Sequence, residues 1–280
     1  NNAINPMASA VKCAWKVTTV SPSYMEELRH SARGLEAIFE YERGKCSGII
    51  NGIDVDVWNP ETDNYLVENF NKESVAEGKQ KNKEHLASQF GLDPNKPLIS
   101  FIGRLVDEKA ADILPEAISQ SIYQYGGKAN FLILGSGDSH VESQLASMNG
   151  QFKGYYNSYI GYSEPLSHVI YAGSDFLLMP SRVEPCGLNQ LYALRYGTVP
   201  MVRNIGGLKD TVVDFGDKNG YGIKMEQSSV WDIVYSIGRA IDLFYNQKDR
   251  LDEMRKYMMG IDNSWDSSAQ HYLDLYQSIL

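Results

Sequence analysis

The feature that most constrains the fold is a regular alternation of short apolar segments with longer segments of helical periodicity. The short segments carry apolar residues on both faces, which is typical of strands in a parallel sheet covered by helices. The predicted strands are residues 16–20, 49–53, 98–102, 130–134, 175–179, 199–202 and 221–224. The predicted helices are residues 75–90, 110–125, 165–173, 188–196 and 229–246. The sequence therefore predicts an α/β fold, a parallel sheet with helices on both faces.

Composition and charge exclude several classes of protein. Hydrophobic residues make up 43% of the 280 residues and charged residues 22%, which is typical of a folded globular chain. Acidic residues outnumber basic ones by 35 to 26, and no block rich in Lys and Arg offsets this balance, so we expect no nucleic-acid partner. We expect no membrane association, because the sequence has no apolar run of the about 18 residues that a spanning helix needs.

The first residues and the cysteines bear on origin and compartment. Residues 1–6 lack the basic and apolar regions of a signal peptide, and the absence of an initiator Met predicts a processed product or a fragment. Cys13, Cys46 and Cys186 are too few and too widely spaced for a disulfide framework or a zinc site. The histidines form no H-x-x-x-H pair, so we expect no metal site. A reducing compartment fits these features best, and we expect the cytoplasm.

The loops after the strands are the places to search for a site, because ligands of such sheets bind beyond the carboxyl ends of the strands. The loop predicted after residues 98–102 carries Arg104 and Lys109. A guanidinium and an ammonium in one loop can clamp a diphosphate and stabilise a departing nucleotide. Taken alone, the two residues are explained more simply as a structural or solvated pair.

The loop predicted after residues 175–179 opens into a helix near Gly187. A helix N-terminus presents unpaired N–H groups and a partial positive charge, which suit a phosphate. Glu184 would face sugar hydroxyls, since a carboxylate repels phosphate; the alternative is an acid that interacts with the helix dipole. Cys186 has no recognisable base partner in the sequence, and we interpret it as a packed side chain and not as a nucleophile.

Three further segments carry weaker signals. Gly206-Gly207 would bring the backbone close to a ligand, or would form a plain turn. Gly135-x-Gly137 is a poor dinucleotide-binding fingerprint, because His140 stands at the third glycine position. Tyr162, an aromatic residue at a strand end, would stack on a nucleobase, or would lie in the core or at its rim.

Outside these loops, the predicted helix 75–90 carries Lys79, Lys81 and Lys83, which we interpret as solvated surface. Residues 60–71 are polar and predict a loop. Ser264 is a candidate N-cap for a last helix, in which apolar residues recur at helical spacing and must pack on something. The residues of this stripe are Tyr272, Leu273, Leu275, Tyr276, Ile279 and Leu280.

The order of these signals is more specific than any one of them. The chain contains, in order, Gly103-Arg104-x4-Lys109, Gly135-x-Gly137-Asp138, Gly161-Tyr162, Pro180-Ser181-Arg182-x-Glu184-Pro185-Cys186-Gly187-Leu188-x-Gln190-Leu191-Tyr192 and Gly206-Gly207-Leu208-x-Asp210-Thr211-Val212. This series resembles bacterial glycogen synthases and plant starch synthases. Residues 17–24, 51–54 and 58–60 look like the inter-domain region of that family, and the end from Ser264 looks like its terminal helix. The resemblance therefore covers nearly the whole chain.

The resemblance implies the GT-B fold, in which two Rossmann-like domains face a cleft. This chain is similar to the second, nucleotide-sugar-binding domain. The implied organisation is a tail of the N-terminal domain with the inter-domain segment over residues 1–47, the Rossmann-like donor domain over 48–258 and a terminal crossover helix over 259–280. The Lys-x-Gly-Gly-Leu loop and the donor-side histidine of the family's first domain have no counterpart here. We therefore expect the acceptor half to be missing, this part alone to be inactive, and the last helix to be exposed or packed differently.

The resemblance also implies a reaction and its residues. Glucose would pass from ADP-glucose or UDP-glucose to the non-reducing end of an α-1,4-glucan, with retention and with neither cofactor nor metal. Arg104 and Lys109 would bind the diphosphate and stabilise the leaving nucleotide, and Glu184 would hold glucose hydroxyls. The implied donor-binding residues are Tyr162 for the base, Cys186, Gly187 and Leu188 for the sugar, Asn189 for phosphate through its backbone N–H, and Gly206 and Gly207 for the loop beside the donor.

Three positions depart from the family pattern. Ala110 replaces the glycine that follows the motif lysine, and Ile205 replaces a threonine before Gly206. Tyr192 stands eight positions after Glu184, where the wider retaining glycosyltransferases carry a second glutamate, and this favours the glycogen and starch synthase branch. Two alternatives stay open: another GT-B glycosyltransferase, and a non-catalytic module that binds a nucleotide or a glucan.

Overall fold

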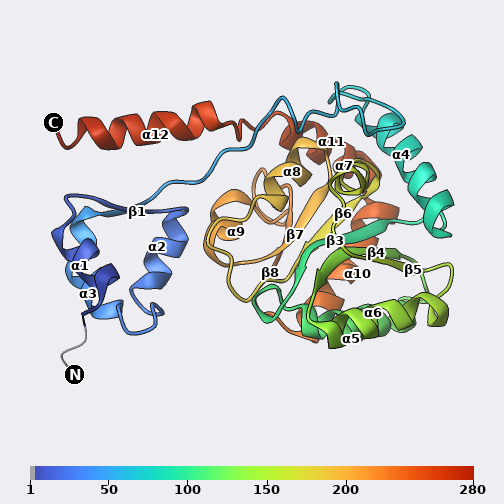
Figure 1. Ribbon diagram of the computed structural model, residues 1–280. Helices are drawn as coiled ribbons and strands as arrows, with labels where there is room; N and C mark the ends of the chain where they lie inside the picture. The colour runs from blue at the N-terminus through green and yellow to red at the C-terminus, as the bar shows by residue number, and fades with distance from the viewer. Residues whose placement is uncertain (1–3) are drawn as a thin grey trace.

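The computed structural model describes residues 4–280, which form a large α/β body and a small N-terminal unit (Figure 1). The elements of the small unit are α1 (Pro6–Cys13), β1 (Val17–Thr19), α2 (Pro22–Leu28), α3 (Glu36–Tyr41) and β2 (Cys46–Gly48). Strands β1 and β2 form a two-stranded parallel sheet, and the buried apolar core beside it consists of Val11, Met25 and Phe39. Residues 49–74 then lead into the body without a helix or a strand.

The body is built on a six-stranded parallel sheet in the order β5-β4-β3-β6-β7-β8. Its strands are β3 (Leu98–Leu105), β4 (Asn130–Gly137), β5 (Tyr156–Ile160), β6 (Phe176–Met179), β7 (Val199–Arg203) and β8 (Ile223–Met225). Its helices are α4 (Val75–Phe90), α5 (Leu114–Gln124), α6 (Ser139–Gln151), α7 (Glu164–Gly173), α8 (Asn189–Arg195), α9 (Gly206–Thr211), α10 (Val230–Asn246) and α11 (Lys248–Met259). The predicted α/β fold is confirmed.

Alternation along the strands explains the two helical layers. Phe131 and Ile133 of β4 pack into the cluster that includes apolar residues of α5, α6 and α10. Their neighbours Leu132 and Leu134 pack into a second cluster with residues of α4 and α7. Successive side chains of a strand point to opposite faces, so strands that are apolar at every position bury both faces of the sheet.

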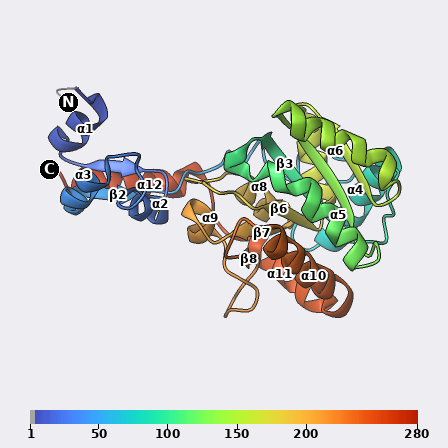
Figure 2. The same ribbon diagram turned by 90° about the horizontal axis from the view of Figure 1, so that it is seen from below.

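Helix α12 (Trp265–Gln277) and the small unit extend from the same side of the body (Figures 1 and 2). Ser264 caps this helix as predicted, because its side chain accepts a hydrogen bond from Ser267 N at 3.3 Å. The apolar stripe of the helix is largely exposed, with Leu273 and Tyr276 more than half accessible to solvent. The chain passes between the small unit and the body at Ile53, and between the body and α12 at Asn263. A hydrogen bond from Ile53 N to Asn263 O at 2.8 Å joins these two crossings.

Several predicted boundaries are wrong. The strand predicted at residues 49–53 lies instead at Cys46–Gly48, and only Ile49 N still bonds to Thr19 O of β1, at 2.9 Å. The helix predicted from residue 110 begins at Leu114, because Ala110 adopts a left-handed backbone (φ 55°) between two 3₁₀ turns. Edge strand β5 is not among the predicted strands, because its YNSYI sequence carries polar residues and lacks a continuous apolar run.

The interpretation of Lys79 and Lys83 as solvated surface is also wrong, although Lys81 is exposed. Spacing of four residues places Lys79 and Lys83 on the same face of α4, and both are buried. Lys79 Nζ donates to the carbonyl oxygens of Tyr171 and Tyr196, at 3.1 and 3.0 Å, near the C-termini of α7 and α8. A buried lysine side chain thus satisfies the last carbonyl groups of two helices.

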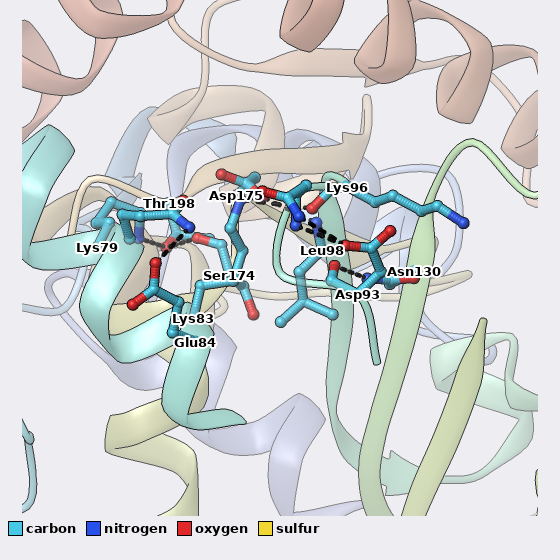
Figure 3. Close-up of polar contacts among 12 residues, drawn as sticks. Lys79, Lys83, Glu84, Asp93, Lys96, Leu98, Asn130, Ser174, Asp175 and Thr198 are labelled. Carbon is cyan, nitrogen blue, oxygen red and sulfur yellow. Dashed lines mark hydrogen bonds and ion pairs between the residues drawn. The ribbon is translucent and has the colours of Figure 1, made fainter. Parts of the chain in front are cut away.

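Lys83 belongs to a buried ion cluster at the amino ends of the strands (Figure 3). Its Nζ lies 3.0 Å from Asp175 Oδ2, and Arg255 Nη2 lies 2.6 Å from Asp175 Oδ1. Leu98 N donates to the same carboxylate at 2.8 Å. Burial opposes the charge of Asp175, but the two cations and this N–H outweigh it and hold the pKa of Asp175 below its ordinary value. The cluster joins α4, β3, β6 and α11.

Candidate functional site

The order of the strands marks one place on the sheet as the site. From β3 the chain proceeds outward through β4 to β5, then returns to the other side of β3 and proceeds outward again through β6, β7 and β8. The loops that follow β3 and β6 therefore diverge, and ligands of doubly wound sheets bind at this switch point. Lys109 follows β3 and Glu184 follows β6, so two of the predicted residues lie on the two loops concerned.

Lys109 and Glu184 form an ion pair that spans these two loops. Ser181 Oγ also donates to Glu184, with 3.0 Å to Oε2. The Glu184 side chain is 7% exposed and that of Lys109 is 24% exposed, so the pair is largely removed from water. Opposite charges in such surroundings interact more strongly than at an open surface, and they present a fixed cation and a fixed hydrogen-bond acceptor at the switch point.

Arg182 fastens the same two loops to each other. Its backbone N donates to Glu108 O at 2.8 Å, and its guanidinium donates to both oxygens of Asp112, at 2.6 and 2.9 Å. The hydrogen bond from Arg182 lowers the pKa of Asp112. The sequence motif contained Arg182 without assigning it a role; its contacts show that it positions the loop after β3 against the loop after β6.

Arg104 lies in a strand and not in the loop that the sequence predicted. Strand β3 continues to Leu105, paired with β4 as far as Gly137, because glycines in β4 leave room for the neighbouring backbone. A Cβ on Gly135 would lie 2.3 Å from Gly103 O, and one on Gly137 would lie 2.4 Å from Leu105 O. The exposed Arg104 guanidinium lies 3.4 Å from Glu108, and it does not share the Lys109–Glu184 pair.

A cavity of about 480 Å³ opens beside the carboxyl ends of β3, β4 and β5. Its lining includes Arg104, Tyr162 and Asn189 from the predicted set. The volume falls in the range of about 300–1,000 Å³ that is usual for small-molecule sites. Tyr162 stands at the rim, 82% exposed, and the charge of Glu164 raises the pKa of its phenol. Aromatic rings and one guanidinium thus border a hollow that is large enough for a nucleoside.

The cavity wall also includes three aromatic residues to which the sequence analysis gave no role in a site: Trp58, Tyr171 and Tyr192. The Trp58 ring stacks on Tyr192 and on His168, with 3.9 Å between centroids in each case. Behind it, His168 Nδ1 lies 2.7 Å from the Asp63 carboxylate. Burial opposes the charge of Asp63, yet its hydrogen bonds with His168 and Tyr196 hold its pKa below the ordinary value. The available signal was that Trp58 and Tyr192 both stand in segments that resemble the family.

The segment between Glu184 and α8 has a backbone conformation that requires glycine at position 187. Gly187 has a left-handed φ of 73°, and a Cβ there would lie 2.4 Å from Gln190 Oε1. Cys186 is buried, and burial raises the pKa of its thiol. Leu188 precedes α8 and is partly exposed, while Asn189 begins the helix and its Nδ2 donates to Ile102 O at 2.7 Å.

Gly206 and Gly207 begin α9 and pack directly on the backbone of Glu184 and Cys186. The predicted residues therefore fall into two neighbouring groups along one edge of the sheet. The cavity group is Arg104, Tyr162 and Asn189. The loop group is Lys109, Glu184, Cys186, Gly187, Leu188, Gly206 and Gly207. Within residues 4–280, no three His, Cys, Asp or Glu side chains are placed to hold a metal ion, and no helix there has the length and apolar character to cross a membrane.

Comparison with known families and relatives gives a consistent picture. The family described as "Glycosyl transferases group 1" matches residues 82–258, and the one described as "Starch synthase catalytic domain" matches residues 1–41. A glycogen synthase of Flavobacterium johnsoniae is 53% identical over 280 residues, which is 100% of this chain and 59% of the relative. A glycogen synthase of Rhodospirillum rubrum is 40% identical over 282 residues, 99% of this chain and 57% of the relative. The chain thus spans rather more than half the length of these curated relatives.

Solved structures agree with these matches. The catalytic domain of starch synthase IV from Arabidopsis thaliana, bound to ADP and acarbose, superposes with a TM-score of 0.89 at 35% identity, over 98% of this chain and 58% of that one. A sucrose-phosphate synthase from Thermosynechococcus elongatus, with a TM-score of 0.66 at 18% identity over 98% of this chain and 60% of that one, shares the fold. The chain therefore belongs to the glycosyl transferases group 1 family, has the fold of the C-terminal domain of a GT-B glycosyltransferase, and resembles glycogen and starch synthases along its whole length.

Proposed function

We propose that this chain is the donor-binding part of a glycogen or starch synthase. The enzyme would transfer glucose from a nucleoside diphosphate glucose to the non-reducing end of an α-1,4-glucan, with retention at the anomeric carbon. The observation that carries the proposal is the Lys109–Glu184 ion pair at the switch point, beside a cavity bordered by Arg104 and Tyr162. Relatives named glycogen synthase match the chain from end to end.

Each group of residues would serve one part of the donor. The cavity would take the nucleoside, with Tyr162 stacked on the base. The diphosphate would lie between Arg104 and Lys109, whose positive charges stabilise the charge that develops on the leaving nucleotide. Glu184 would accept hydrogen bonds from glucose hydroxyls. Cys186, Gly187 and Leu188 would line the sugar, Asn189 would offer its N–H to phosphate, and Gly206 and Gly207 would shape the loop beside the donor.

The donor that we propose is ADP-glucose. The starch synthase IV structure, 35% identical to this chain, is described as bound to ADP, whereas the structures described with UDP are only 12–14% identical and indicate the fold alone. The proposal assigns no cofactor, since the nucleotide sugar is a substrate. It places the acceptor glucan against an N-terminal GT-B domain, which the greater length of the relatives could accommodate. It places the reaction in the cytoplasm.

The test is calorimetric titration of the 280-residue chain with ADP and with UDP, repeated on Lys109→Ala. We expect ADP to bind more tightly than UDP, and Lys109→Ala to weaken ADP binding about tenfold or more, because hydrogen bonds to charged groups contribute about 1.5–3 kcal/mol. Lys153→Ala is the matched control, since Lys153 is exposed and remote from the site, and it should bind ADP like the wild type. Equal ADP affinity in wild type and Lys109→Ala would refute the site assignment.

A further inference from the structure

Helix α2 of the small unit docks on α9 through reciprocal carboxylate contacts. Gly206 N donates to Glu27 Oε1 at 2.7 Å, so a carboxylate of α2 binds the first N–H group of α9. In the other direction, Ser23 N and Ser23 Oγ donate to the Asp210 carboxylate of α9, at 2.8 and 2.6 Å. Ser21, the N-cap of α2, donates from Oγ to Pro185 O. The four bonds fix α2 relative to both α9 and the loop after β6.

The Gly206–Gly207 turn has no freedom to move independently of Glu184. Gly207 N donates to Glu184 O at 3.1 Å. A Cβ on Gly206 would lie 2.0 Å from Glu184 O, and a Cβ on Gly207 would lie 2.1 Å from Cys186 O. Backbone is thus packed directly on backbone, and a shift of the turn must shift the Glu184–Cys186 segment with it.

Glu27 therefore supports the Glu184 side of the site and does not contact the cavity. The turn that it holds contacts Glu184, whose carboxylate meets Lys109, in the loop group of residues. Neither Glu27 nor Gly206 belongs to the lining of the 480 Å³ cavity that contains Arg104 and Tyr162. The two ends of the site are consequently supported by different parts of the chain.

We propose that Glu27 is a positioning residue for the sugar end of the donor site. Its carboxylate holds the Gly206–Gly207 turn against the Glu184–Cys186 backbone and so sets where Glu184 presents its oxygens. The inference rests on the proposed function, in which Glu184 holds the glucose of the donor and the cavity holds the nucleoside. It predicts that Glu27 governs the affinity for the glucosyl part of a nucleotide sugar and not the affinity for the nucleotide.

The experiment compares ADP with ADP-glucose by calorimetric titration of the 280-residue chain. Glu27→Ala should weaken ADP-glucose binding about tenfold and leave ADP binding within about twofold of the wild type. Glu27→Gln should bind both ligands like the wild type, because its amide oxygen can accept the same bond from Gly206 N. Glu26→Ala is the matched control: Glu26 is the preceding residue of α2, is exposed and pairs with Arg29, and its loss should change neither affinity.

The outcomes separate this inference from the proposed function. A wild-type chain that binds neither ligand contradicts the proposed donor site itself. A wild-type chain that binds both, with a Glu27→Ala variant that loses both equally or neither, overturns the role of Glu27. Amide hydrogen exchange of Gly206 provides a second readout: it should accelerate in Glu27→Ala and stay protected in Glu27→Gln, and protection unchanged in Glu27→Ala would also overturn the inference.

Discussion

Replacement of Asp175 by Asn should destabilise the protein by about 3–5 kcal/mol, since the change leaves two buried cations without their anion. Lys83 and Arg255 contact opposite oxygens of this carboxylate, at 3.0 and 2.6 Å, and their side chains are 5% and 7% exposed. The Asn side chain keeps the shape of Asp and can still accept the bond from Leu98 N, so the lost charge is the main change (Figure 3).

The matched control is Asp252→Asn. Asp252 contacts the same arginine, with 3.4 Å to Arg255 Nη1, but its side chain is 29% exposed. A partly solvated ion pair contributes about 0–1 kcal/mol, so this variant should remain close to the wild type. The two substitutions make the same chemical change next to the same guanidinium and differ mainly in burial.

The assay is equilibrium unfolding in urea, followed by circular dichroism and by tryptophan fluorescence. With an m-value of about 3 kcal/mol/M, a loss of about 4 kcal/mol lowers the urea midpoint of Asp175→Asn by about 1.3 M. A midpoint within about 0.3 M of the wild type, or an equal shift in Asp252→Asn, would refute the view that this cluster depends on a buried anion.

Three other predictions concern stability. Lys79→Met should destabilise the protein by at least about 2 kcal/mol, because buried carbonyl groups of α7 and α8 lose their donor. Lys81→Met, on the exposed face of α4, should cost less than about 0.5 kcal/mol. Comparable urea midpoints for the two variants would contradict the burial argument. Gly187→Ala should cost at least about 1–2 kcal/mol because φ is 73°, whereas Gly150→Ala within α6, where a Cβ has open space, should stabilise by up to about 1 kcal/mol, and thermal unfolding measures both. The pKa values of Asp63, Asp175 and Asp214 lie below the ordinary 3.8, so the stability that these carboxylates contribute is present above that pH and is lost as the pH falls through their lowered values. The melting temperature should therefore be steady between pH 7 and 5 and fall below about pH 3.8. A decline that begins near pH 6 would point to other groups.

The parallel sheet could be predicted because its evidence is local. Segments such as 98–102 and 130–134 are apolar at all but one position, and this pattern follows directly from burial on both faces. The loops of the site follow from the same pattern, since they come directly after those strands. Boundaries were less predictable: the extension of β3 to Leu105 depends on the glycines of β4, which the sequence of β3 alone does not reveal.

The contacts that the sequence did not reveal join residues far apart in the chain. Lys79 is surface-like by composition, and its partner Tyr196 stands 117 positions later. Glu27 and Gly206 are 179 positions apart, and neither is unusual in its own segment. Arg104 and Lys109 are only five positions apart, yet the structure gives them different partners, Glu108 and Glu184, because one lies in a strand and the other in a 3₁₀ turn.

The paired crossings of the chain have a mechanical consequence. Residues 53 and 264 form a parallel bridge where the chain enters the body and where it leaves, and Gly52 makes room for the backbone of Trp265, since a Cβ there would lie 2.4 Å from its Cα. A single crossing can both swing and twist, but two crossings bonded side by side resist torsion and leave a swing about one axis. Movement of the small unit would thus be a hinge rotation about one axis, limited by the contact between α2 and α9.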